Sequence, residues 1–113
     1  MYVKEFIESS IFNNLDVKSQ DLLLDLFKKL ESIDFIVVKR NEPTIVLKAR
    51  NMFESNPKSQ CNIATIRFKE GYITVGPYKN LDENIVKCKT IEDINEDLIN
   101  KIIDIYNEKS LKL

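Results

Sequence analysis

The chain has 113 residues, 43% hydrophobic and 31% charged, which is typical of one folded domain with a single core and excludes a disordered segment. No hydrophobic run approaches the roughly 20 residues that cross a bilayer, and the first residues lack the pattern of a signal peptide, so we expect a cytoplasmic protein without a membrane partner. The net charge of −1 favours no class of partner, and the absence of histidine excludes Ser-His and Cys-His nucleophile pairs and His-containing zinc sites.

The N-terminal third of the chain is expected to be helical. Hydrophobic residues within 2–11 recur at helical spacing and predict one short amphipathic helix. Asp16 is a candidate N-cap for a second helix, because its short side chain can accept from the free amides of the first turn. That helix is expected to run to about Ile33. Two of its leucines, Leu22 and Leu24, lie off its apolar stripe.

The hydrophobic period then falls to two, which predicts strands. Residues 34–40 and 44–50 are rich in β-branched side chains and flank a turn at 41–43, and 51–60 are expected to form a loop. The sequence NIATIRFKEGYITVG at 62–76 alternates on both sides of a Glu-Gly pair, which indicates a β-hairpin. A last strand is expected over 84–89.

The C-terminal segment predicts a long amphipathic helix. Thr90 and Asp93 have the spacing of a capping box. Hydrophobic residues then recur at steps of three and four and form one apolar stripe, namely Ile91, Ile94, Leu98, Ile102, Ile105 and Tyr106. The order of elements predicts a single α+β domain over 1–113. Its expected architecture is a two-layer sandwich of N-terminal helices, an antiparallel sheet of four to five strands, and a C-terminal helix packed on one sheet face.

Alternation in the hairpin assigns its side chains to two faces. The residues expected inward, beneath the helices, are Ala64, Ile66, Phe68, Ile73 and Val75. Those expected outward are Ile63, Thr65, Arg67, Lys69, Tyr72 and Thr74. One face therefore builds the core, and the other is basic and carries an aromatic ring.

Charge is distributed unevenly along the chain. Residues 35–80 carry eight basic and three acidic groups, whereas 1–34 and 81–113 each have a balance of −3. An exposed basic sheet face with an aromatic ring suits nucleic acid, because cations neutralise phosphates and a ring stacks on a base. The candidate nucleic-acid-binding residues are Lys48, Arg50, Arg67, Lys69, Tyr72, Lys87 and Lys89. The alternative is that this face is only solvated, since the same residue types occur on any water-facing sheet.

Other chemistry has less support in the sequence. The acidic start of the last helix, 92–97, allows a divalent-metal site, although acidic residues also favour helix N-termini for electrostatic reasons. Gly71 and Gly76 are the only glycines, so no glycine-rich phosphate cradle can form. We expect no catalytic residues and no cofactor. Cys61 and Cys88 are expected to be reduced structural thiols.

The C-terminal half also resembles a known group of domains. NIATIRFKEGYITVG followed by NIVKCKTIEDINEDLINKIIDIYNE is similar to small uncharacterised α+β domains at the C-terminus of some GmrSD-type restriction proteins and beside other predicted nucleases. Thr90, Glu92, Asp93 and Tyr106 occupy the corresponding helix-start and helix-end places. The resemblance implies a bacterial, restriction-associated accessory role that is not catalytic, and it supplies no catalytic residues.

These observations lead to one main hypothesis and two alternatives. The main hypothesis is a non-catalytic binding module whose basic sheet face meets nucleic acid or an acidic protein surface. The first alternative is a protein-interaction element, either a homodimer or a modulator subunit of a larger defence complex, in which helical surfaces including Leu22 and Leu24 bind. The second is a divalent-metal-binding protein that uses the acidic helix start.

Overall fold

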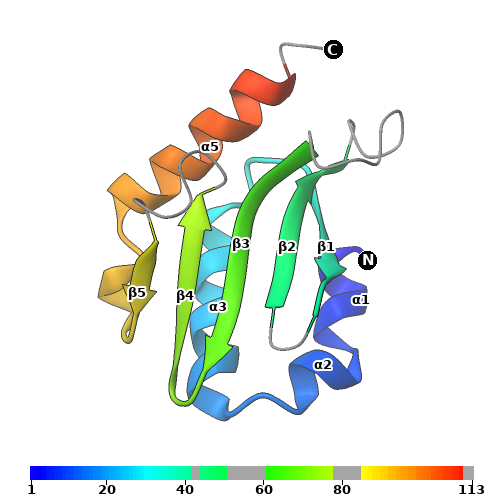
Figure 1. Ribbon diagram of the computed structural model, residues 1–113, viewed down its shortest axis with the longest axis vertical. Helices are drawn as coiled ribbons and strands as arrows, with labels where there is room; N and C mark the ends of the chain where they lie inside the picture. Colours follow the sequence, from blue (N-terminus) through cyan, green and yellow to red (C-terminus); the bar gives the residue numbers. More distant parts are fainter. Residues whose placement is uncertain (42–43, 51–60, 78–84, 111–113) are drawn as a thin grey trace.

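The structure is a computed structural model that describes residues 1–41, 44–50, 61–77 and 85–110 (Figure 1). Three helices come first: α1 (Val3–Ile7), α2 (Ser10–Asn13) and α3 (Val17–Lys29). Five strands follow: β1 (Phe35–Lys39), β2 (Thr44–Ala49), β3 (Asn62–Lys69), β4 (Tyr72–Pro77) and β5 (Val86–Cys88). A 3₁₀ turn, η2 (Ile91–Asp93), leads to the C-terminal helix α5 (Glu96–Ser110). The loop predicted at 51–60 and part of the turn predicted at 41–43 lie outside the described residues.

The five strands form one antiparallel sheet in the order β1-β2-β3-β4-β5, so every strand pairs with its neighbours in the sequence (Figure 1). Core residues from α1, α2, α3 and α5 pack together with one phase of the strands, including Val37, Leu47 and Ile66. The helices therefore cover one face of the sheet. This arrangement confirms the predicted α+β class, with the C-terminal helix packed on that face.

The predicted hairpin is formed by β3 and β4. Lys69 pairs directly with Tyr72, so Glu70 and Gly71 are the whole connection. Gly71 has a φ of 79°, which a residue without a side chain adopts at little cost. The five residues predicted inward are all buried in the core, namely Ala64, Ile66, Phe68, Ile73 and Val75.

The prediction that Ile63 faces outward was wrong. Leu47 pairs with Ala64 but Lys48 pairs with Asn62, so the register shifts and Ile63 is the extra residue of a bulge in β3. Ile63 and Ala64 are both fully buried members of the core. Assigning faces by alternation assumes that the residues of β3 pair one by one with those of β2, and the bulge at Ile63 interrupts this pairing.

The N-terminal helix predicted over residues 2–11 is divided in two. Ser9 separates α1 from α2, because its hydroxyl accepts from the amide of Phe12 and donates to the carbonyl of Phe6. The bend lets the Phe6 ring pack edge-on against Phe12 and Phe27, at centroid distances of 5.8 and 6.0 Å. The predicted N-cap of α3 is confirmed, since Asp16 accepts from the amide of Ser19 at 3.0 Å.

The C-terminal helix begins later than predicted. The Thr90–Asp93 capping box forms, but it caps η2, and the side chain of Asn95 caps α5 by accepting from the amide of Leu98 at 3.0 Å. Ile91 consequently lies outside the helix and is 51% exposed, so it does not belong to the buried stripe. The other predicted stripe residues are buried in the core or packed against it, namely Ile94, Leu98, Ile102, Ile105 and Tyr106.

Candidate nucleic-acid interface

Four cations gather on the sheet face that points away from the helices. Arg67 and Lys69 lie on β3, Lys87 lies on β5, and Lys89 lies just after it. We call Arg67, Lys69, Lys87 and Lys89 the basic cluster. Arg67 pairs with Thr74 of β4, which pairs with Lys87, so these three residues form one row across the sheet. The next row contains Lys69 and Tyr72.

The basic cluster is open to solvent, because all four of its cationic side chains are exposed. Within the part of the chain that the structure describes, none of them forms an ion pair with a carboxylate. Their charge is therefore available to an anion. The sequence placed these four residues on one face through strand phase alone, and the structure brings them together.

Tyr72 lies at the centre of the basic cluster and is half-buried. The Nζ of Lys87 is 5.3 Å from the centroid of the Tyr72 ring, and the Nζ of Lys89 is 6.0 Å from it. A ring face attracts cations through its quadrupole, so Tyr72 holds two ammonium groups near each other despite their repulsion. In the unbound protein the ring organises charge, a role different from the base stacking that the sequence suggested.

Lys48 was predicted in the same surface, and the structure corrects this. The residue lies on the face away from the helices, since it pairs with Asn62 and follows Val46 in phase, but it is only 8% exposed. Its Nζ donates to the Oδ1 of Asn62 and lies 3.9 Å from the Sγ of Cys61. A buried ammonium needs acceptors, and Asn62 supplies one. Lys48 is thus part of the protein interior.

Arg50 is also separate from the basic cluster. Its guanidinium lies 3.6 Å from a carboxylate oxygen of Asp34, and its Cζ lies 5.1 Å from the centroid of the Tyr2 ring. These contacts tie the end of β2 to the N-terminal segment and to the residue that precedes β1. Arg50 is therefore already engaged with an anion and an aromatic ring at the β1 side of the sheet.

The acidic helix start does not form a metal centre among the described residues, where no group of three or more His, Cys, Asp or Glu side chains converges. Asp93 accepts from the amides of Lys89 at 2.8 Å and Thr90 at 3.1 Å, and these bonds hold the pKa of its carboxyl below the usual value. Asp97 pairs with Lys101 at 3.2 Å. Asp93 and Asp97 therefore each interact with groups that are close to them in the sequence.

Both cysteines are buried thiols that form no disulfide with each other. Burial in the core raises the pKa of the Cys88 thiol to about 11, with the nearby Asp93 charge adding to the effect. A thiol of this kind is a poor nucleophile at neutral pH, because the thiolate is the reactive form. Cys88 is therefore a reduced thiol packed in the core.

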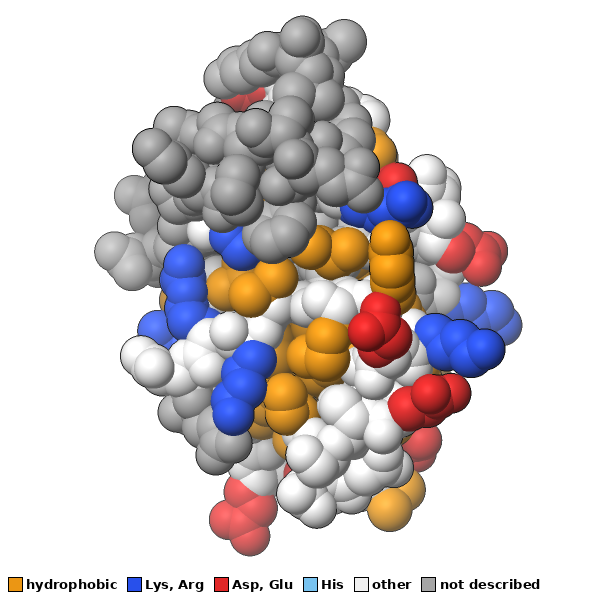
Figure 2. Space-filling view, turned by 90° about the vertical axis from the view of Figure 1, so that its right-hand side faces the viewer, with side chains coloured by type: hydrophobic (Ala, Val, Ile, Leu, Met, Phe, Trp, Pro, Cys, Tyr) orange, Lys and Arg blue, Asp and Glu red, His pale blue; other side chains and the backbone are white. Residues whose placement is uncertain are grey.

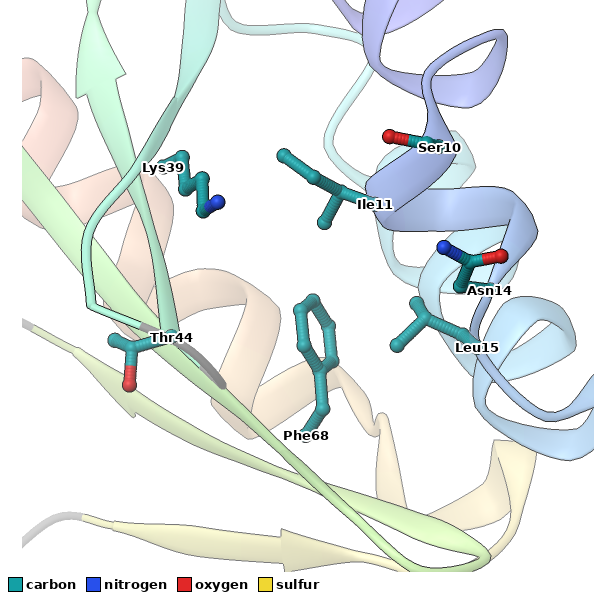
Figure 3. Close-up of a pocket in the computed structure, with 7 residues that line it drawn as sticks. All are labelled: Ser10, Ile11, Asn14, Leu15, Lys39, Thr44 and Phe68. Carbon is teal, nitrogen blue, oxygen red and sulfur yellow. The ribbon is translucent and has the colours of Figure 1, made fainter.

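A small hollow that sequence reasoning missed lies between α2 and the sheet, with a volume of about 270 Å³ (Figure 3). Ile11, Leu15 and Phe68 form its apolar side, and Lys39 reaches toward it from β1. Figure 2 views the molecule from the side of β1 and shows hydrophobic side chains within hollows on this face, with charged side chains around them. No pattern in the sequence brings α2 and β1 together, so no local signal could have found it. A single cation beside apolar side chains indicates a class of ligand less specifically than the four cations of the basic cluster do.

Comparison of the chain with known protein families, with curated proteins and with solved structures found no match. In the part of the chain that the structure describes, no helix has the length and hydrophobicity that a bilayer span requires.

Proposed function

We propose that the protein is a non-catalytic module that binds nucleic acid on the basic cluster. The observation that carries this proposal is the gathering of four exposed cations on one sheet face, without a carboxylate partner among the described residues. Such a surface binds a polyanion by releasing the counterions condensed on it. An accessory role beside a nucleic-acid-directed enzyme, which the family resemblance implies, is compatible with this activity.

The spacing of the cations suits a phosphate backbone. Side chains two residues apart on a strand are separated by about 6.7 Å, and β3 and β5 lie about 9.5 Å apart because β4 separates them. Arg67 and Lys69 therefore form one short line of charge, and Lys87 and Lys89 form a second line beside it. A single strand can follow one line while its bases lie over Thr74 and Tyr72 between the two.

The test is the salt dependence of binding to fluorescent single- and double-stranded oligonucleotides. Each phosphate neutralised adds about 0.9 to the slope of log K against log salt for duplex DNA and about 0.7 for single strands. The double variant Arg67→Gln/Lys69→Gln should weaken binding and lower this slope by one to two. The matched control Lys4→Gln/Lys101→Gln changes the net charge equally on the helical side and should leave the slope unchanged.

Two results would contradict the proposal. The first is an absence of binding at micromolar protein and low salt. The second is an equal loss of binding in the two double variants, which would mean that overall charge and not the basic cluster attracts the polyanion.

A further inference from the structure

Ile91 projects from the molecule between two hollows on the helical side. The first hollow lies between α3 and η2, is lined by Leu22, Leu24 and Ile91, and has a volume of about 500 Å³. The second lies between η2 and α5, has a similar volume of about 500 Å³, and is lined by Ile91, Ile94 and Ile99. Because Ile91 borders both, the two hollows form one continuous surface.

The exposure of Ile91 is a built feature of the fold. Lys29 of α3 donates to the carbonyl of Ile94 at 2.8 Å and to that of Ile91 at 3.4 Å, which fastens η2 to the helix. Asp25 holds the same ammonium at 2.7 Å. The Thr90–Asp93 capping box fixes the other side of the turn. An isoleucine that is 51% exposed on a turn held from both sides presents an ordered apolar surface.

Shape and hydrophobicity are complementary within this surface. Leu24 and Ile91 project, with exposed fractions of 40% and 51%, whereas Leu22, Ile94 and Ile99 are buried and form the apolar bases of the hollows. Projecting side chains of one copy can thus enter the hollows of another. Exposed apolar surface bordered by charged residues is typical of protein–protein interaction sites.

The charges of the two hollows are opposite. Lys18, Lys28 and Lys89 line the first hollow together with Asp21 and Asp25. Lys29, Glu92 and Glu96 line the second. Asp25 and Lys29 form an ion pair, so their charges cancel each other. The ammonium of Lys89 lies over the Tyr72 ring on the open sheet face and adds no charge to this hollow. Lys18 and Lys28 against Asp21 then leave the first hollow at +1, and Glu92 and Glu96 leave the second at −2.

We propose that this surface is the interface of a symmetric homodimer, in which the first hollow of each copy faces the second hollow of the other. A twofold axis near Ile91 brings the positive first hollow onto the negative second hollow twice and places Leu24 over Ile94 and Ile99 at the base of the second hollow. A second copy fits better than an unrelated partner, because one surface carries both complementary halves, as an isologous interface must.

The first test is the mass in solution, measured by sedimentation or light scattering from micromolar to near-millimolar concentrations. The full chain should approach twice its monomer mass of 13.2 kDa. Ile91→Asp should remain a monomer, whereas Ile85→Asp, which changes an equally exposed isoleucine outside both hollows, should dimerise like the parent chain. A parent chain that stays monomeric throughout overturns the proposal, and so does equal dimerisation of the two variants.

A charge exchange tests the pairing of the hollows. Lys18→Glu/Lys28→Glu makes both hollows negative, and Glu92→Lys/Glu96→Lys makes both positive, so each variant alone should dimerise more than about tenfold more weakly. An equimolar mixture should recover the dimer, because every contact between unlike copies then joins opposite charges. Circular dichroism establishes that both variants fold. Folded variants that dimerise normally alone, or a mixture that stays monomeric, would contradict this arrangement.

Discussion

The ammonium of Lys87 lies over the ring of Tyr72, 5.3 Å from its centroid, and is thereby held on the open face of the sheet. The register explains why the pair forms. Lys87 pairs with Thr74, and Tyr72 lies two residues from Thr74 along the same strand and on the same face. Long lysine side chains normally sample many rotamers, so a ring that confines two of them reduces the entropy lost when an anion binds.

Replacing the ring therefore tests its role in the basic cluster. Tyr72→Leu should weaken nucleic-acid binding about two- to fivefold, because a cation–π contact at an exposed site contributes about 0.5–1 kcal/mol. The salt slope should not change, since no charge is removed. Tyr72→Phe keeps the ring face and should bind like the parent chain. If Phe is as weak as Leu in the anisotropy assay, the hydroxyl and not the ring is what matters.

Lys48 and Lys69 offer a matched pair on the same sheet face, one buried and one exposed. Lys48→Met removes the donor to Asn62 Oδ1 and leaves that buried oxygen unpartnered, which should cost about 1–3 kcal/mol in the free energy of unfolding. Binding of oligonucleotides should not change. Lys69→Met should do the reverse, with a stability change within about 0.5 kcal/mol and weaker binding. Urea denaturation measures the stability of each variant, and fluorescence anisotropy measures its binding of oligonucleotides. A Lys48→Met variant that is as stable as the parent chain but binds weakly would contradict the structure.

The sheet and most of its faces could be predicted because alternation is a local signal. In β3 and β4 the side chains at Ile66, Phe68, Ile73 and Val75 alternate with polar ones, and a two-residue Glu-Gly connection preserves the phase. The same phase brought Arg67 and Lys69 to the face that carries Lys87. Where the pairing of strands is regular, the alternation in the sequence is sufficient to assign each side chain to a face of the sheet.

The remaining differences depend on tertiary contacts. The bulge at Ile63 comes from the register of β2 against β3. No residue type in β3 indicates this register in the sequence. The burial of Lys48 depends on its surroundings in three dimensions, and strand phase does not report these. Thr90 and Asp93 cap a 3₁₀ turn as well as they cap an α-helix, so they could not show that Ile91 would be exposed.

Gly71 is expected to be the most sensitive position of the hairpin connection. Its φ of 79° is unfavourable for a residue with a side chain, although no atom lies within 4 Å of where a Cβ would be. Gly71→Ala should therefore cost about 1–2 kcal/mol through backbone strain alone. Gly71→Asn should cost less, because asparagine tolerates the left-handed region. Glu70→Ala is the control, and a Gly71→Ala variant as stable as that control in urea would contradict the conformation.

Asp16 makes the stability of α3 dependent on pH. The amide of Ser19 donates to its carboxylate at 3.0 Å and the Ser19 hydroxyl donates at 2.8 Å, and these bonds, the backbone one foremost, lower the pKa of Asp16 below its ordinary 3.8. A carboxyl whose pKa is lower in the folded than in the unfolded state stabilises the fold above the unfolded value. This stabilisation is lost as the pH falls through the folded value.

Asp16→Ala should accordingly cost about 1 kcal/mol at neutral pH, the typical value of an N-cap. The difference from the parent chain should shrink as the pH falls below about 4, because the parent loses the charged cap that the variant never had. Asp21→Ala, an exposed aspartate on the same helix, should cost less than about 0.5 kcal/mol. Urea denaturation at a series of pH values measures all three chains. A difference between Asp16→Ala and the parent that stays constant into acid would mean that the cap acts through the neutral carboxyl, since only the ionised form gains from the lowered pKa.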